Sequence, residues 1–213
     1  NLNLPMDTWY GVNLSNGCVS RLTLQSNQLV GTIPSELGNL NHLINLYLHH
    51  NQLNGIIPSE LGELSLLEEL SLRGNQLTGS IPASIADIPE LETLSLQNNK
   101  LTGNIPVELG NLISLRRLWL HQNNLSGVIP SELGNLVNLQ ELSLSENHLS
   151  GNIPIEIGNL SDLTLLWLHI NNLTGNIPST FGNLNELNDL IFYQNNLTGN
   201  IPSELYMLNN MER

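Results

Sequence analysis

Histidine, cysteine and carboxylate side chains are the groups in this 213-residue chain that could carry out metal, nucleophilic or acid–base chemistry. Three of the six histidines, His49, His121 and His169, recur at the same position of a repeating pattern, several repeats apart. Ligands to one metal ion must all lie about 2.0–2.1 Å from it, and side chains spread so widely along a regular array do not achieve this. We therefore predict no metal site, and we expect no cofactor.

Nucleophilic and acid–base catalysis also find little support in the sequence. Cys18 is the only cysteine, so the chain has neither an internal disulfide nor a CxxC motif. The GxSxG, HExxH, P-loop and GxGxxG motifs are missing. Carboxylate pairs such as Glu68–Glu69 and Glu141 with Glu146 occur without a pattern that would enclose them in a pocket. The sequence favours a protein that is not an enzyme.

A single repeating pattern organises the whole chain. Eight copies follow LxxLxLxxNxLxGxIPxxLGxLxx, whose positions we number from 1 at the first leucine to 24 at the end. Position 13 is Gly and position 16 is Pro in every copy. Self-similarity at such a period is typical of solenoids, in which each unit packs only against its neighbours. Position 9 is always asparagine and forms a predicted structural ladder: Asn27, Asn51, Asn75, Asn99, Asn123, Asn147, Asn171 and Asn195.

The repeat predicts a short strand followed by turns rather than a long helix. Apolar and variable residues alternate over positions 3 to 7, which is the period of a strand with one buried face. The Leu and Ile residues at positions 1, 4, 6, 11, 15, 19 and 22 then point inward, each contributing roughly 1.5–3 kcal/mol when buried. The asparagine amides can satisfy backbone groups in the turn. A residue run such as SELG after the proline fits one 3₁₀ turn.

The expected organisation is an N-terminal cap over residues 1–18, eight repeats over 19–210, and the start of a ninth repeat or a truncated C-terminal cap at 211–213. The formal net charge of −13 makes nucleic acid or an anionic membrane surface a poor partner. Apolar runs are far shorter than the roughly 20 residues that cross a bilayer, so no membrane insertion of this segment is expected.

Residues 19–210 resemble the plant-specific class of leucine-rich repeats, which is marked by LxGxIPxxLGxL after the asparagine. This class occurs in ectodomains of plant receptor-like kinases and in polygalacturonase-inhibiting proteins. The resemblance implies a right-handed, curved solenoid, α/β by convention but mostly β with 3₁₀ turns, whose parallel sheet lines the concave side. The segment Trp9–Val12 resembles the cap of such ectodomains, although the lone Cys18 is more similar to cysteine-poor algal, protist and bacterial relatives.

Positions 3, 5 and 7 of each repeat should face outward from the concave sheet, where the core does not need large residues. Trp, Tyr and Arg dominate binding hot spots, and strands two apart in a sheet are separated by roughly 10 Å. We predict a recognition patch over repeats 5 to 8 and a smaller one near His50. The alternatives are that this face is unused or contacts a second copy of the chain. The candidate ligand-binding residues are Trp119, Trp167, Arg117, His121, His169, Tyr193, Leu165, Tyr47 and His49.

The leading functional hypothesis is a recognition module of a cell-surface or secreted protein that binds a protein, a peptide or a glycan. Several histidines on one face also suggest a pH-sensitive interface. One alternative is an inhibitor of a secreted polysaccharide-degrading enzyme. Another is an ice-binding surface built on Thr–Gly–Asn or Ser–Gly–Asn triplets at positions 12 to 14, as at 102–104, 150–152, 174–176 and 198–200. We expect an extracellular or cell-surface location, although a single cysteine also fits an intracellular one.

Acidic residues should lie mainly away from the concave face. Five cations, Arg21, Arg73, Lys100, Arg116 and Arg117, and six carboxylates, Glu68, Glu69, Glu92, Glu141, Glu146 and Asp189, fall on that face and its flanks, a sum of −1. The remaining negative charge falls on the caps, the turns and the opposite side. The sequence therefore predicts a nearly neutral, aromatic-bearing binding face.

Overall fold

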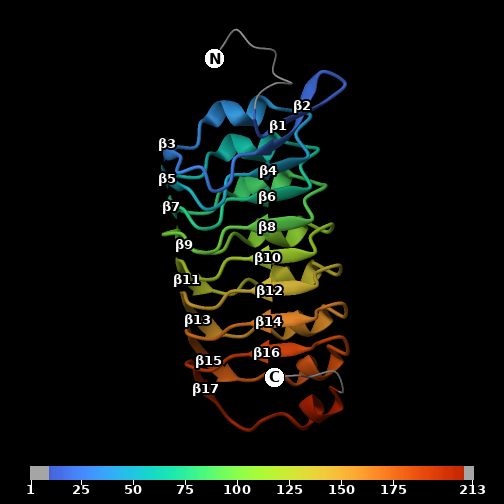
Figure 1. The fold of residues 1–213 in the computed structure, drawn as a ribbon. Helices are drawn as coiled ribbons and strands as arrows, with labels where there is room; N and C mark the ends of the chain where they lie inside the picture. The colour runs from blue at the N-terminus through green and yellow to red at the C-terminus, as the bar shows by residue number, and fades with distance from the viewer. Residues whose placement is uncertain (1–9, 209–213) are drawn as a thin grey trace.

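The computed structural model describes residues 10–208. Within that range the chain forms a solenoid whose coils stack in sequence order, as Figure 1 shows from the blue N-terminal end to the red C-terminal end. Trp9, which belongs to the predicted cap, and the predicted ninth-repeat start at 211–213 lie outside the described residues.

One long sheet runs the length of the solenoid, as predicted. Its strands are parallel, except that β1 pairs antiparallel with β2 in a hairpin at the N-terminal end. In repeats 2 to 8 each strand of this sheet covers positions 3 to 5, so equivalent residues of successive repeats pair in register. In order across the sheet, the strands are β1 (Val12–Ser15), β2 (Cys18–Thr23), β4 (Asn45–Tyr47), β6 (Glu69–Ser71), β8 (Thr93–Ser95), β10 (Arg117–Trp119), β12 (Glu141–Ser143), β14 (Leu165–Trp167) and β16 (Asp189–Ile191).

A second extended segment in each coil forms two shorter sheets beside the long one (Figure 1). The first comprises β3 (Val30–Thr32), β5 (Gln52–Gly55) and β7 (Gln76–Leu77). The second comprises β9 (Thr102–Gly103), β11 (Asn124–Val128), β13 (His148–Asn152), β15 (Asn172–Asn176) and β17 (Asn196–Thr198).

A short 3₁₀ helix follows the proline of each repeat. In the fifth repeat Pro130 has φ of −63°, and its carbonyl accepts a hydrogen bond from the Leu133 N–H at 3.2 Å. This i to i+3 bond closes one tight turn and brings the leucine inward. The helices are η2 (Ser35–Asn39), η3 (Ser59–Glu63), η4 (Ala83–Asp87), η5 (Val107–Asn111), η6 (Ser131–Asn135), η7 (Ile155–Asn159), η8 (Ser179–Asn183) and η9 (Ser203–Met207).

The core is a continuous column of Leu and Ile side chains between the sheets and the 3₁₀ helices. In the fifth repeat, Leu115, Leu118, Leu120, Leu125 and Leu133 are all fully buried. Each makes its contacts with the coils on either side, which is why a single repeat has no core of its own. Within residues 10–208, no helix has the length and apolar character that a membrane crossing requires.

The asparagine at position 9 ties each coil to the one before it. The Asn123 amide accepts a hydrogen bond from the Leu101 N–H at 3.0 Å and donates to the Leu96 and Leu120 carbonyls at 3.1 Å. These bonds satisfy backbone groups that the tight turn would otherwise leave buried and unpaired. Asn27, in the first repeat, is exposed.

Candidate ligand-binding face

The outward side of the long sheet, formed by positions 3, 5 and 7 of the repeats, is called here the front face. Strand pairing places Trp119, Ser143 and Trp167 in one row across β10, β12 and β14. The same pairing places Leu165 between Glu141 and Asp189 in the neighbouring row. Repeat geometry therefore brings together side chains from equivalent positions of successive repeats.

Aromatic residues at position 5 are hydrogen bonded to a carboxylate at position 3 of the next repeat. The Trp119 Nε1–H donates to Glu141 at 3.0 Å, and the Trp167 Nε1–H donates to Asp189 Oδ2 at 2.9 Å. In the third case the Tyr47 hydroxyl donates to Glu69 at 2.6 Å. The sequence separation is 22 residues each time, one repeat less two positions.

Rings from repeats 5 to 8 form a contiguous group, which we call the C-terminal aromatic cluster: His121, Trp167, His169 and Tyr193. Trp167 makes edge contacts with both histidines at centroid distances of 6.2 Å. Burial lowers the pKa of His121 and His169, while the nearby Glu146 carboxylate acts in the opposite direction. Both imidazoles are therefore mainly neutral near pH 7, which suits them to hydrogen bonding or stacking rather than ion pairing.

The N-terminal patch is smaller and contains Tyr47, His49 and His50. Successive ring centroids lie 6.0 and 5.5 Å apart in edge-on arrangements. Burial raises the pKa of Tyr47 to about 12, with further contributions from the hydrogen bond to Glu69 and its charge. Burial also lowers the pKa of His49, and the positive charge of Arg73 adds to that effect.

Arg117 and Trp119 occupy the centre of the front face. The Arg117 Nε lies 3.7 Å from Glu141, and its Nη1–H donates to the Thr93 hydroxyl at 3.3 Å. Glu141 thus contacts both the guanidinium of Arg117 and the indole of Trp119. Among the described residues, no ring contact joins Trp119 to the C-terminal aromatic cluster. The predicted patch over repeats 5 to 8 is therefore two groups: one around Glu141 and one around Trp167.

Unpartnered polar atoms gather on the front face. In the described part of the chain, seven buried side-chain nitrogen or oxygen atoms have no hydrogen-bond partner, and all seven belong to positions 3, 5 or 7. Buried polar atoms in folded proteins are nearly always paired, so a face that concentrates the exceptions is suited to receive a polar ligand. The atoms are Thr23 Oγ1, Gln25 Oε1, His49 Nδ1, His121 Nδ1, Ser143 Oγ, His169 Nδ1 and Asp189 Oδ1.

Sequence reasoning did not single out Glu69, Glu141, Asp189 or Ser143 as site residues. The signal for the carboxylates was present as three aromatic residues at position 5, each followed by Glu or Asp at position 3 of the next repeat. Ser143 has no sequence signal of its own, because serine also occupies position 5 in repeats 3 and 4. Among the described residues, no group of three or more His, Cys, Asp or Glu could hold a metal ion.

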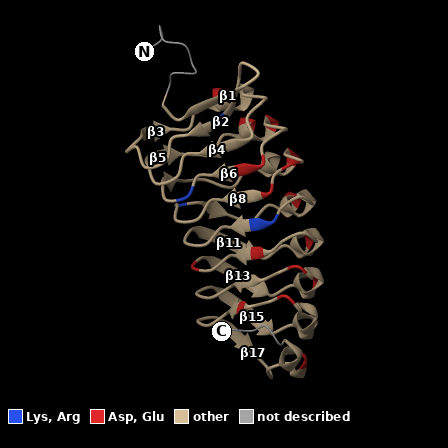
Figure 2. Cartoon of the chain, turned by 45° about the vertical axis from the view of Figure 1, so that its right-hand side comes forward, with Lys and Arg blue, Asp and Glu red and all other residues tan. Residues whose placement is uncertain are grey.

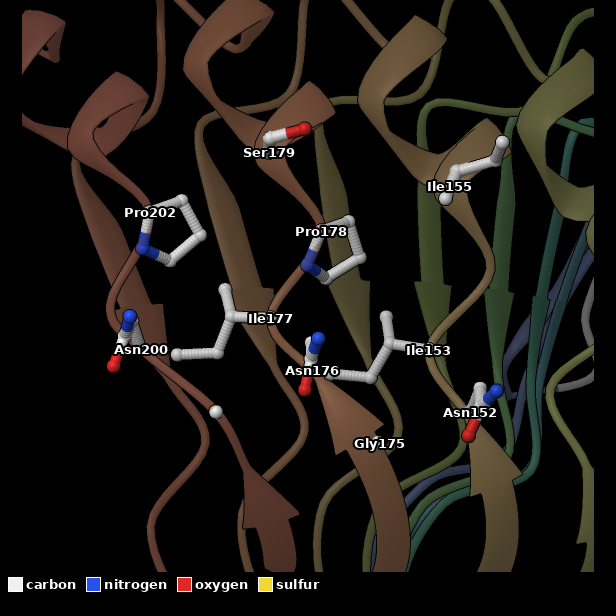
Figure 3. A pocket seen from close by; sticks show the side chains of 11 residues that line it. Asn152, Ile153, Ile155, Gly175, Asn176, Ile177, Pro178, Ser179, Asn200 and Pro202 are labelled. Carbon is white, nitrogen blue, oxygen red and sulfur yellow. The ribbon is translucent and has the colours of Figure 1, made fainter.

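A second feature lies beside the front face, where the shorter sheet meets the 3₁₀ helices. Figure 3 shows a groove lined by Asn152, Asn176 and Asn200 together with Pro178 and Pro202. Its volume is about 740 Å³. The three asparagines come from position 14 of successive repeats and are exposed. They belong to the Ser/Thr–Gly–Asn triplets that the sequence singled out as an ice-binding alternative.

Stacked coils with a leucine core and an asparagine ladder define a repeat protein whose free sheet face presents its variable residues. The chain belongs to the leucine-rich-repeat family. The leucine-rich repeat region family matches residues 18–149, and a further leucine-rich repeat matches residues 162–184. Comparison with curated proteins gave no match.

Solved structures of plant receptor ectodomains are similar to this chain. The leucine-rich-repeat ectodomain of the membrane receptor kinase GASSHO1/SCHENGEN3 from Arabidopsis thaliana, in complex with CASPARIAN STRIP INTEGRITY FACTOR 2, is 42% identical, with a TM-score of 0.96 over 98% of this chain and 26% of that one. The plant peptide hormone receptor RGFR1, in complex with RGF2, is 41% identical, with a TM-score of 0.86 over 86% of this chain and 30% of that one. The chain thus spans less than a third of either receptor chain.

A plant ice-binding protein is a more distant structural relative. It is 25% identical, with a TM-score of 0.62, and the match covers 92% of this chain and 80% of that one. The same repeat scaffold therefore supports proteins of different functions, and function has to be argued from the variable positions.

Proposed function

We propose that this chain is a non-catalytic recognition module that binds an extended peptide or protein segment on its front face, in a receptor-type protein at the cell surface or secreted from the cell. The observation that carries the proposal is that the seven buried, unpartnered polar atoms of residues 10–208 all lie on that face, around two aromatic patches. Similar plant ectodomains, a peptide hormone receptor solved with RGF2 and a receptor kinase solved with CASPARIAN STRIP INTEGRITY FACTOR 2, support the same assignment.

An extended peptide suits this face because it can supply hydrogen-bond partners to the unpartnered polar atoms of the face. Its backbone presents N–H donors and C=O acceptors along its whole length, and its side chains can pack against Trp167 and Tyr193. Tyr193 is 56% exposed, so it offers apolar area without any rearrangement of the core. Trp119 and His121 extend the same surface toward the middle of the solenoid.

The experiment is selection from a random peptide display library against the immobilised chain, followed by affinity measurements on variants. Trp167→Ala should weaken binding of the selected peptides by about tenfold or more, as expected for a hot spot. Glu156→Gln, in η7 and away from the front face, is the matched control and should leave affinity unchanged. Binding that survives both Trp119→Ala and Trp167→Ala would contradict the proposal. A glycan array with the same variants tests whether a glycan is the ligand instead.

Ice binding is a second candidate, favoured by the exposed polar triplets of the shorter sheet. Thr102, Thr174 and Thr198 at position 12 and the asparagines at position 14 are exposed and regularly spaced. Val128 interrupts the column at position 14. Thermal hysteresis and inhibition of ice recrystallisation would both be expected, and loss of both in Thr174→Val would place the activity on this sheet. Absence of both effects in the unaltered chain would exclude this candidate.

Inhibition of a secreted polysaccharide-degrading enzyme stays a prediction from the family resemblance. Pectinase assays with micromolar concentrations of the chain test it, because an inhibitor of this kind would reduce the rate at that concentration. Unchanged pectinase rates would exclude the inhibitor function.

A further inference from the structure

The three aromatic–carboxylate pairs differ in the residue that precedes the aromatic residue by two positions on the same strand. That residue is Asn45 before Tyr47, Arg117 before Trp119 and Leu165 before Trp167. Its place in the register is beside the paired carboxylate, as in the Arg117–Glu141 and Leu165–Asp189 pairings. One of the three pairs therefore has a cation at this position, one has the polar Asn45, and the Trp167 pair has the apolar Leu165.

Arg117 shows how the arrangement accommodates a guanidinium. Its Nε lies 3.7 Å from Glu141, whose other contact is the Trp119 indole. At the Trp167 pair, Asp189 Oδ2 accepts the Trp167 Nε1–H at 2.9 Å, and Leu165 offers no donor. Asp189 Oδ1 is buried without a hydrogen-bond partner. Arg116–Glu92 and Arg117–Glu141 are the side-chain ion pairs of residues 10–208, so within that range Asp189 has no cationic partner.

Charge is strongly segregated along the solenoid. The sequence contains no Lys or Arg from residue 118 to residue 212, whereas nine Asp and Glu residues lie in that span. Figure 2 shows red segments throughout the C-terminal coils and blue segments confined to the coils before them. The sequence predicts a nearly neutral sum for the whole face and its flanks, but Glu141, Glu146 and Asp189 make its C-terminal half negative. This half is complementary to a cationic ligand.

Ser143 supplies an independent observation at the same place. It lies between Trp119 and Trp167 in the strand register and is 1% exposed, and its Oγ has no hydrogen-bond partner. His169, whose ring contacts that of Trp167, also has a buried and unpartnered Nδ1. Within the described residues, the surroundings of Trp167 therefore combine an aromatic ring, a carboxylate without a cationic partner and unpartnered polar atoms.

We propose that Trp167 and Asp189 form a subsite for an arginine side chain of the peptide ligand, equivalent to the place that Arg117 fills beside Trp119 and Glu141. This inference rests on the proposed peptide-binding function and specifies its ligand. A guanidinium fits because its planar fork matches a carboxylate, it stacks on aromatic rings, and it is less strongly hydrated than an ammonium group. Asp189 is partly buried at the start of β16, and its Oδ1 is the carboxylate atom that a guanidinium would have to reach.

The test uses Nα-acetyl-arginine methylamide as the probe and the tryptophan indole N–H resonances in ¹H–¹⁵N NMR spectra as the readout. The Trp167 resonance should shift saturably, with a dissociation constant on the order of 1 mM for so small a probe. The matched citrulline compound, which is neutral and nearly isosteric, should bind at least about tenfold more weakly. The lysine compound should also bind more weakly, because its ammonium group lacks the fork.

Reciprocal substitutions provide the sharpest controls. Leu165→Arg supplies a cation from within the chain and should abolish the shift at Trp167. Arg117→Leu vacates the equivalent place and should create a saturable shift at Trp119 that the unaltered chain lacks. Circular dichroism of both variants checks that the repeat fold is retained. Asp189→Asn should also reduce the probe-induced shift of the Trp167 resonance, but less completely than Leu165→Arg.

Equal binding of the arginine and citrulline compounds would overturn the inference, as would an unchanged response in Leu165→Arg or Asp189→Asn. Selected peptides that bind the front face without any dependence on arginine would also overturn it while leaving the proposed function intact. Probe binding at Trp167, together with failure to select any front-face peptide, would instead support the subsite and count against the proposed function.

Discussion

His169 stacks on Tyr193 with ring centroids 4.8 Å apart and an interplanar angle of 21°. The contact extends the C-terminal aromatic cluster to the last complete strand of the long sheet, β16, and its neighbouring turn. Because the imidazole is partly buried against other rings, its charged form is disfavoured, and its pKa is lowered. Packing of the cluster is therefore coupled to pH.

The free energy of unfolding should decrease as the pH falls below about 6.5, the pKa of an unperturbed histidine. Burial lowers the pKa of His121 and His169 in the native state, so the unfolded chain binds more protons in this range. The stability present at neutral pH is then lost progressively until the native pKa values are reached. Urea unfolding at pH 7.5 and pH 5 measures the difference.

Matched variants separate this contribution from the titration of carboxylates. His121→Gln combined with His169→Gln should reduce the loss of stability between the two pH values. The exposed His42 and His148 provide the control pair, and their replacement by Gln should leave the loss unchanged. An identical pH dependence in all three proteins would contradict the prediction.

Trp167→Phe should destabilise the chain more than Trp119→Phe, although both changes remove one indole N–H. In the first variant Asp189 loses its hydrogen bond and has no cation among residues 10–208, which should cost about 1–3 kcal/mol. In the second, Glu141 keeps Arg117 at 3.7 Å, so about 0.5–1.5 kcal/mol is expected. Urea unfolding gives both values. Adding Asp189→Leu to Trp167→Phe should recover part of the loss, and equal losses in the two single variants would refute the argument.

The period of the sequence predicts most of the fold because each position has the same surroundings in every coil. The alternation around Leu118 and Leu120 predicts a strand, and the invariant Pro130 and Leu133 positions predict the 3₁₀ turn that follows. These predictions require only that each residue has the same neighbours in every coil, and a regular repeat ensures this.

The front face is less predictable, because its side chains lean across coils and their partners depend on rotamers. Trp119 and Trp167 hold the same position, yet His121 contacts the ring of Trp167, two strands away, and not that of Trp119. Each indole N–H donates its hydrogen bond to a carboxylate of the next coil. A sequence column groups residues by strand position, whereas these contacts run diagonally between columns.

Asn147→Ala should be among the most damaging single substitutions of a polar residue. Asn147 is 5% exposed; its amide accepts from the Leu125 N–H at 3.0 Å and donates to the Leu120 carbonyl at 3.1 Å. Alanine leaves these buried backbone groups unpaired, at about 1–3 kcal/mol for each. Asn27→Ala is the matched control, because Asn27 is exposed, and it should cost less than about 0.5 kcal/mol. Thermal unfolding compares them, and similar losses would contradict the ladder's role.

Gly127 and Gly103 occupy the same repeat position with the same φ of +78°, but their surroundings differ. A Cβ at Gly127 would clash with the Asn104 side chain of the preceding coil, whereas a Cβ at Gly103 would meet Ser80 Cβ at an ordinary 3.5 Å. Both alanine variants carry the strain of a left-handed backbone, roughly 1–2 kcal/mol. Gly127→Ala carries a smaller additional cost of about 0.5 kcal/mol, because the clash is with the amide end of the exposed Asn104 side chain, which can turn away.

The difference between these two variants isolates close packing from backbone conformation. Urea unfolding should show a larger loss for Gly127→Ala than for Gly103→Ala, and Asn104→Ala should remove most of the excess because it clears the space beside residue 127. Equal losses would mean that the left-handed backbone alone explains glycine at position 13. If Gly127→Ala still loses more stability than Gly103→Ala when the Asn104 side chain is removed, the additional loss has a cause other than this contact.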